Sequence, residues 1–120
     1  MAERLPPQIQ NQLALLQQAQ QRLDMLTARK LELERELRET EFAISELEKV
    51  NEDAVVYKIV GGLLVQTDRN KLLEELKERK DSLETRLKLL QRQEERARQQ
   101  VNELREKLKQ SLSERGYQVS

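Results

Sequence analysis

The chain has 120 residues, of which 37% are charged and only 2% are aromatic, and it contains no Cys, His or Trp. This composition excludes a globular domain with an aromatic core, a disulfide framework, and the usual thiol or imidazole catalysis. Basic and acidic residues balance at 22 each, so no net charge attracts nucleic acid or an anionic membrane.

Chemistry that depends on a bound group also has little support. Without His or Cys, the chain lacks the usual general base and the ordinary zinc ligands. Gly61-Gly62 is not followed by the Gly-Lys-Ser/Thr of a phosphate loop. We therefore predict that the protein is not an enzyme and binds no cofactor, metal or nucleic acid. No segment is apolar enough for a signal peptide or a membrane span, and we expect a cytoplasmic protein.

The first predicted element is a helix over residues 6–50. Pro6 and Pro7 suit the first turn of a helix, and no Gly or Pro follows until after Val50. A heptad repeat places apolar residues at nine of twelve seam positions, which is typical of a coiled coil. The seam positions hold Ile9, Gln12, Leu16, Ala19, Leu23, Leu26, Lys30, Leu33, Leu37, Thr40, Ile44 and Leu47.

Residues 54–67 differ from the rest, because they are rich in β-branched residues and contain the turn-forming pair Gly61-Gly62. They predict a β-hairpin in which Val60 pairs with Leu63 and Ile59 with Leu64, so that both faces are mainly apolar. A lone hairpin is marginal in water, and we expect hairpins of several chains to form a shared sheet or barrel. The alternative is a hairpin that folds onto its own helices. The predicted interface residues are Val55, Val56, Tyr57, Ile59, Val60, Leu63, Leu64 and Val65.

A second helix is predicted over residues 68–115, with Thr67 or Asp68 as its cap and a tail at 116–120 that begins with Gly116. Its seam positions hold Leu73, Leu76, Lys80, Leu83, Leu87, Leu90, Glu94, Ala97, Val101, Leu104, Leu108 and Ser111. If the two helices fold back on each other, the charged seam residues Lys30 and Glu94 lie in adjacent layers, close enough for a charge pair. The interpretation we favour is that both reach solvent along their aliphatic stems.

The two helices bury their seams if the chain folds back on itself. The predicted fold is therefore mainly α: one domain, residues 1–120, formed by a long antiparallel two-helix coiled coil with a central hairpin. Facing residues have numbers that add to 120. Registers in which these numbers add to 113 or 127 would fit the heptad equally well. The linker lengths favour the register with a sum of 120.

Several apolar residues lie off the seam or at its end far from the hairpin. Gln12 and Ser111 weaken the seam there, and we expect the helix ends to fray and expose Ile9 and Leu108. Glutamine fills half of positions 8–21, so this end carries little charge. The cluster is compatible either with a binding surface or with the ordinary scatter of exposed Leu residues. Its members are Leu5, Ile9, Leu13, Leu15, Leu108, Leu112, Tyr117 and Val119.

The predicted order of elements is a helix, one hairpin with the sequence EDAVVYKIVGGLLVQ, and a second helix. With this order and this hairpin sequence, the chain resembles the β-type subunit of prefoldin, particularly the archaeal form. The most specific match comprises Glu52-Asp53-Ala54, Val56-Tyr57-Lys58, Gly61 and Leu64-Val65, and Arg92 to Arg96 also fit. An α-type subunit would carry two hairpins, whereas this chain has one.

The resemblance implies a hexamer of two α-type and four β-type subunits, in which the hairpins build a double β-barrel. It also implies an ATP-independent holdase that grips non-native proteins with its coiled-coil tips and delivers them to a group II chaperonin. On this reading the apolar cluster above binds clients. The alternative is a structural coiled-coil adaptor that oligomerises through its hairpin and holds fixed partners.

Overall fold

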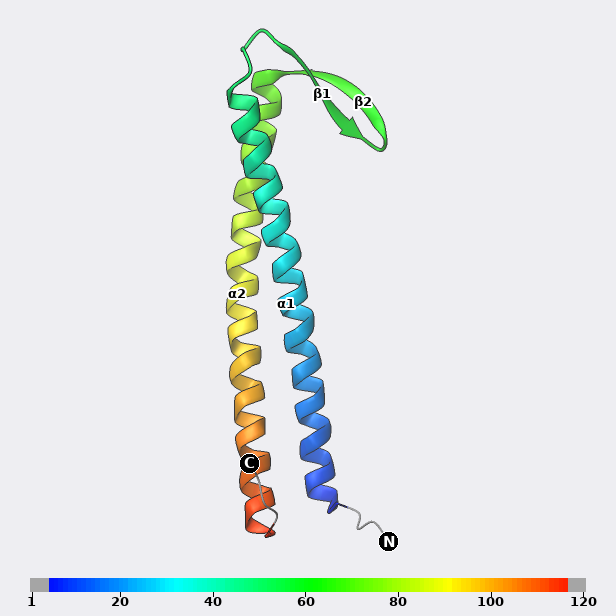
Figure 1. Ribbon diagram of the computed structural model, residues 1–120, viewed down its shortest axis with the longest axis vertical. Helices are drawn as coiled ribbons and strands as arrows, with labels where there is room; N and C mark the ends of the chain where they lie inside the picture. The colour runs from blue at the N-terminus through cyan, green and yellow to red at the C-terminus, as the bar shows by residue number, and fades with distance from the viewer. Residues whose placement is uncertain (1–4, 117–120) are drawn as a thin grey trace. The chain divides into compact units, whose positions relative to one another are not determined.

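A computed structural model describes residues 5–116. Helix α1 (Pro7–Glu48) is followed by strands β1 (Val55–Val60) and β2 (Leu63–Asp68) and by helix α2 (Arg69–Glu114) (Figure 1). Two long helices around one hairpin confirm the predicted mainly helical fold class. Of the predicted tail, only Gly116 lies within the described residues.

The chain divides into two compact units. Residues 1–29 and 90–120 form one unit, called here the terminal unit because it holds both chain ends. Residues 30–89 form the other, called the hairpin unit. Each unit contains a segment of α1 and a segment of α2, and the hairpin unit also contains both strands.

Burial confirms the heptad pattern in both units. Every buried side chain among residues 5–116 occupies a predicted seam position, and ten of the twelve are hydrophobic. A two-helix coiled coil buries only a narrow stripe of seam residues on each helix, and this is the pattern of burial observed. The buried residues are Ile9, Ala19, Leu23, Leu26, Thr40, Ile44, Leu47, Leu83, Glu94, Ala97, Val101 and Leu108.

Within the terminal unit, the two helix segments run antiparallel. Gln8 contacts Arg115, Gln12 contacts Ser111 and Thr27 contacts Glu94, so residue numbers on α2 fall as those on α1 rise. Thr27 would face residue 93 in the predicted register, but residue 100 or 86 in the two alternatives. Its hydrogen bond to Glu94 therefore indicates the predicted register in this unit.

In the hairpin unit, the strands pair as predicted from the sequence. Val60 lies opposite Leu63 and Ile59 opposite Leu64, and the antiparallel ladder extends to Val55 and Asp68. Gly61 and Gly62 adopt φ angles of 55° and 82°, the left-handed conformation that a tight two-residue turn requires at both central positions. The glycine pair thus sets both the turn and the register.

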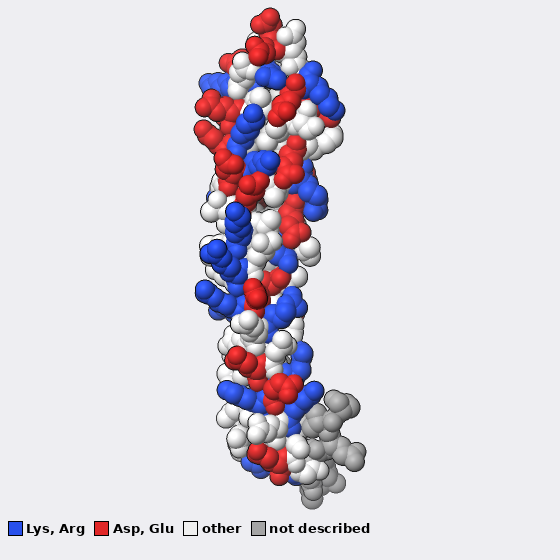
Figure 2. Space-filling model, turned by 90° about the vertical axis from the view of Figure 1, so that its left-hand side faces the viewer, with Lys and Arg blue, Asp and Glu red and all other residues white. Residues whose placement is uncertain are grey.

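Charged side chains cover much of the surface of each unit. Figure 2 shows basic and acidic side chains interspersed, with uncharged surface between them. Most of the ion pairs within residues 5–116 join residues three or four apart in the sequence, such as Arg35 with Glu39. Such exposed pairs contribute little to stability, so the seams supply most of the packing energy.

Candidate functional site

The predicted interface residues of the hairpin are largely exposed to solvent. Ile59, Leu64 and Leu63 are 77%, 73% and 70% exposed. Val55, Tyr57, Val60 and Val65 are also exposed, and only Val56 is partly buried. The structure therefore does not support the alternative in which the hairpin packs its apolar faces onto its own helices.

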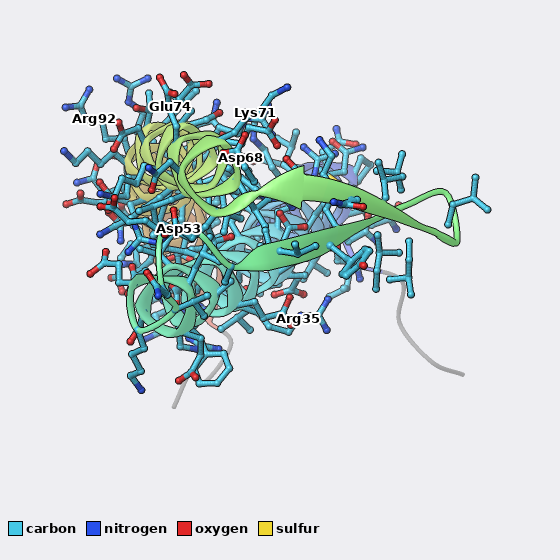
Figure 3. All side chains as sticks on the ribbon, turned by 90° about the horizontal axis from the view of Figure 1, so that it is seen from above. Arg35, Asp53, Asp68, Lys71, Glu74 and Arg92 are labelled. Carbon is cyan, nitrogen blue, oxygen red and sulfur yellow. The ribbon has the colours of Figure 1, made fainter. Side chains whose placement is uncertain are left out.

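Apolar side chains stand on both faces of this hairpin. The pair Ile59–Leu64 lies on one face and the pair Val60–Leu63 on the other, because neighbouring residues of a strand alternate between faces. Figure 3 shows the hairpin between Asp53 and Asp68, with side chains projecting from both sides of the ribbon. A two-stranded sheet also has unpaired backbone on both edges. These features are those of a sheet that needs further strands.

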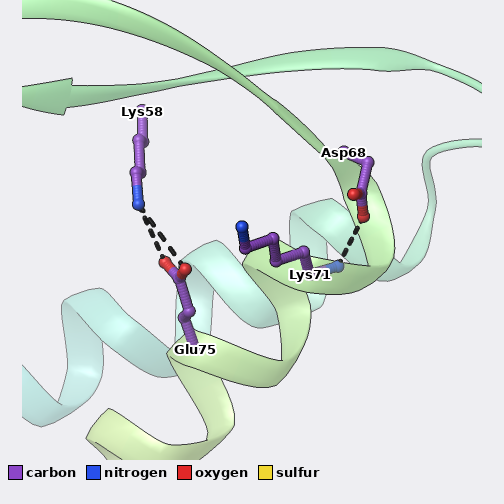
Figure 4. A network of polar contacts seen from close by, with 4 residues as sticks. All are labelled: Lys58, Asp68, Lys71 and Glu75. Atoms are coloured by element: carbon purple, nitrogen blue, oxygen red, sulfur yellow. Dashed lines mark hydrogen bonds and ion pairs between the residues drawn. The ribbon is translucent and has the colours of Figure 1, made fainter.

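Polar contacts attach the hairpin to the start of α2. Lys58 Nζ lies 3.2 Å from Glu75 Oε2, which joins β1 to the second turn of the helix (Figure 4). Asp68 Oδ1 accepts a hydrogen bond of 2.7 Å from the backbone N–H of Lys71, so Asp68 is the cap predicted for this helix. The cap and the ion pair orient the hairpin without covering its apolar side chains.

Arg69 caps the C-terminus of α1, an interaction that the sequence pattern did not predict. Its Nε donates to the carbonyl oxygen of Leu47 and its Nη2 to that of Glu48, both at 3.2 Å. The last carbonyls of a helix have no partner within the helix and carry partial negative charge. A guanidinium group therefore holds the two helix ends together at the base of the hairpin.

The predicted client cluster is only partly exposed. Leu15 is 51% exposed, and Leu5, Leu13 and Leu112 are partly buried. Ile9 and Leu108 are buried, at 0% and 8% exposure, although we expected the helix ends to fray and bare them. Tyr117 and Val119 lie outside the described residues. Among the described members of the predicted client cluster, Leu15 is therefore the most exposed to solvent.

Hydrogen bonds between the helices explain why this end is closed. Gln12 Nε2 donates to Ser111 Oγ at 2.9 Å, and Arg115 Nη2 donates to Gln8 Oε1 at 3.1 Å. Sequence reasoning treated Gln12 and Ser111 only as weak seam residues and missed that they pair. Gln12 Oε1 is nevertheless buried without a hydrogen-bond partner within residues 5–116, which costs about 1–3 kcal/mol. The closed end therefore contains one destabilised layer.

Glu94 corrects another expectation. Instead of reaching solvent, it is 7% exposed and lies in the seam of the terminal unit. Thr27 Oγ1 donates to Glu94 Oε2 at 2.9 Å, and Arg98 Nη2 lies 3.6 Å from Glu94 Oε1. The buried carboxylate is held by a hydroxyl and a cation, which is what desolvation of a charge requires.

Two kinds of site are not found within residues 5–116. No three acidic side chains there are grouped so as to hold a metal ion. The helices of this described part also contain no stretch with the length and hydropathy of a membrane span.

Comparison with known proteins places the chain in a family. The family model of the prefoldin subunit matches residues 10–115. Prefoldin subunit beta of Methanothrix thermoacetophila is 49% identical over 95% of both chains, and that of Methanococcoides burtonii is 43% identical over 97% of this chain and 99% of its own. The crystal structure of the prefoldin beta subunit from Thermococcus strain KS-1 superposes with a TM-score of 0.81 at 39% identity, covering 92% of this chain and 97% of the other. The resemblance read from the hairpin sequence is thus confirmed, and the chain belongs to the prefoldin subunit family of chaperones.

Proposed function

We propose that this chain is the β-type subunit of an ATP-independent holdase. It assembles through its hairpin with α-type subunits, in a complex of two α-type and four β-type chains. The coiled-coil ends in the terminal unit capture non-native proteins, which then pass to a group II chaperonin in the cytoplasm. The observation that carries this proposal is the hairpin, which exposes apolar side chains on both faces in a chain whose relatives are prefoldin β subunits.

Assembly follows from the energetics of the hairpin. Each Val, Leu or Ile side chain that moves from solvent into a packed interface contributes ~1.5–3 kcal/mol. Seven of the eight predicted interface residues are exposed, so a shared sheet would bury enough apolar surface to offset the cost of association. The unpaired strand edges would gain partners in the same step. A structural adaptor would use the same hairpin, so assembly alone does not identify a holdase.

Client capture depends on apolar groups that the seam does not occupy. Leu15 is exposed, and Leu5, Leu13 and Leu112 are partly exposed at the same end. One such end with two or three engaged side chains would bind weakly. Several ends that engage one client raise the overall avidity by about 10²–10⁴, provided that they can bind together. Oligomerisation through the hairpin is therefore what makes weak ends effective.

Aggregation assays test this function against the adaptor. Several unrelated proteins are diluted from denaturant with the chain assembled with an α-type subunit, and light scattering is followed without ATP. A holdase suppresses aggregation of all of them, whereas an adaptor suppresses none. Native mass measurement with and without the α-type subunit tests the stoichiometry of the complex.

Delivery requires a separate measurement. A labelled client bound to the assembled chain is mixed with a group II chaperonin, and the two complexes are separated by size. We expect the label to move to the chaperonin without ATP hydrolysis by this chain. A label that stays with the chain would remove the delivery step from the proposal and leave the capture step.

A further inference from the structure

Two hollows that share Arg22 and Gln100 form a groove beside the seam in the terminal unit, and two of the three seam residues that line it are alanines. Its first part has a volume of about 420 Å³ and is lined by Leu15, Gln18, Ala19, Arg22, Gln100 and Leu104. Its second part, of about 260 Å³, shares Arg22 and Gln100 with the first and adds Gln93, Arg96 and Ala97. Ala19 and Ala97 are buried seam residues with small side chains, which leave room where a Leu would fill the flank.

The two ends of this groove differ in chemistry. One end is apolar, because Leu104 and the exposed side chain of Leu15 lie there. Two guanidinium groups follow, that of Arg22 where the two parts meet and that of Arg96 in the second part. Within residues 5–116 neither arginine forms an ion pair, although other cations of the terminal unit, such as Arg98, do. The glutamines along both rims carry amide groups that can donate to and accept from a peptide backbone.

The charge of the whole terminal unit also favours a negatively charged ligand. Residues 1–29 and 90–120 contain ten basic and seven acidic residues, whereas residues 30–89 contain twelve basic and fifteen acidic residues. The balanced charge of the chain therefore conceals a positive terminal unit. A complementary ligand would be negatively charged where it meets the arginines.

From these observations we infer that the groove binds an extended segment of non-native polypeptide that carries an apolar and an acidic side chain about three residues apart. The spacing follows from geometry. Leu15 and Arg22 are two helical turns apart, ~10.5 Å at 1.5 Å per residue, and an extended chain advances ~3.3 Å per residue. The apolar side chain of the segment lies between Leu15 and Leu104. The carboxylate of its acidic side chain accepts hydrogen bonds from Arg22 and Arg96. This inference rests on the proposed holdase function and specifies its substrate class.

Labelled peptides with one Leu in a Ser-rich chain test this preference by fluorescence anisotropy. The acidic probe carries Asp three residues from the Leu, and the neutral and basic probes carry Asn or Lys in its place. The full chain assembled with its α-type subunit should bind the acidic probe roughly two- to thirtyfold more tightly than the neutral probe, since two exposed charge pairs contribute about 0.2–1 kcal/mol each. The basic probe should bind most weakly, and high salt should reduce the differences.

Two paired variants locate the effect. Arg22→Gln with Arg96→Gln should lower the affinity for the acidic probe to that for the neutral probe, and Arg22→Lys with Arg96→Lys should retain most of it. Arg92→Gln with Arg105→Gln is the matched control, because both arginines are exposed in the same unit, outside the groove, and neither forms an ion pair within residues 5–116. The control should bind all probes as the original chain does.

Different failures have different meanings. Equal affinity for the acidic and neutral probes, or an equal loss in the control variant, would overturn the groove assignment. If the assembled chain suppresses aggregation although it binds the acidic and neutral probes equally, the proposed holdase function is retained and only the groove assignment is wrong. Absence of binding by every probe, together with absence of protection, would overturn both.

Discussion

The hairpin unit and the terminal unit share one heptad pattern but expose different side chains. The hairpin unit exposes aliphatic residues at fixed strand positions, with Ile59, Leu63 and Leu64 each at least 70% exposed. The terminal unit contains thirteen of the fourteen glutamines and has a positive charge balance, and its most buried residue is Ile9 at the chain end. A regular apolar surface with open strand edges suits one defined partner. An amide-rich surface with scattered Leu residues suits many partners, because amide groups both donate and accept hydrogen bonds.

The largest effect is expected from a charge placed in the hairpin. Ile59→Asp would bury a carboxylate in a shared sheet, at a cost of several kcal/mol. We expect monomers that remain helical, measured by light scattering and circular dichroism. Ser45→Asp, at an exposed position of the same unit, is the control and should assemble normally. A full oligomer of the Ile59→Asp variant would show that the hairpin is not the assembly surface.

Removal of the chain ends should separate the two tasks. A chain without residues 1–12 and 109–120 lacks most of the client cluster and keeps the whole hairpin unit. We expect normal oligomers with weaker protection in the aggregation assay, because Leu5 and Leu112 are lost while Leu15 and the groove beside Ala19 and Ala97 remain. Leu5, Leu13 and Leu112 changed together to Ser should also weaken protection, and Ile9 is left in place because it is fully buried. Full protection by the truncated oligomer would show that the removed ends, with Leu5 and Leu112, do not bind clients.

A smaller effect concerns the polar layer near the chain ends. Gln12→Leu with Ser111→Ala removes the buried oxygen that has no partner within residues 5–116, and should stabilise the closed end by about 1–3 kcal/mol. Opening of this end would become roughly five- to 150-fold rarer. Hydrogen exchange should slow in the neighbouring amides. Protection of clients should fall, because Ile9 and Leu108 become available to a client only when this end opens.

The exposed pair Gln17→Leu with Ser113→Ala is the matched control for this variant. If hydrogen exchange slows equally in both pairs, the polar layer does not determine how often the end opens. Slower exchange with unchanged protection would restrict client binding to the residues that are already exposed.

The smallest effect should come from the cap at the base of the hairpin. Asp68→Ala removes the acceptor for the Lys71 N–H and should lower the free energy of unfolding by about 1 kcal/mol, seen as a reduced Tm. Asp81→Ala, at an exposed position inside the same helix, should leave Tm nearly unchanged. Equal Tm values for the two variants would mean that the cap does not stabilise α2.

Periodicity predicted most of the fold and less of the candidate site. Every buried residue of the described chain was placed on the seam by the heptad, and Gly61-Gly62 predicted the strand pairing, because both patterns are local. The burial of Glu94, the cap formed by Arg69 and the bond between Gln12 and Ser111 depend on partners distant in sequence. Heptad positions specify which residues face the partner helix, but not which polar atoms meet there.

Photo-crosslinking in the assembled oligomer tests the division of tasks most directly. A photoreactive residue replaces either Leu64 in the hairpin unit or Leu13 in the terminal unit, and the oligomer is irradiated with a denatured client present. We expect Leu64 to crosslink to neighbouring subunits and Leu13 to crosslink to the client. Client crosslinks at Leu64 without any at Leu13 would contradict the assignment of assembly to the hairpin and capture to the chain ends.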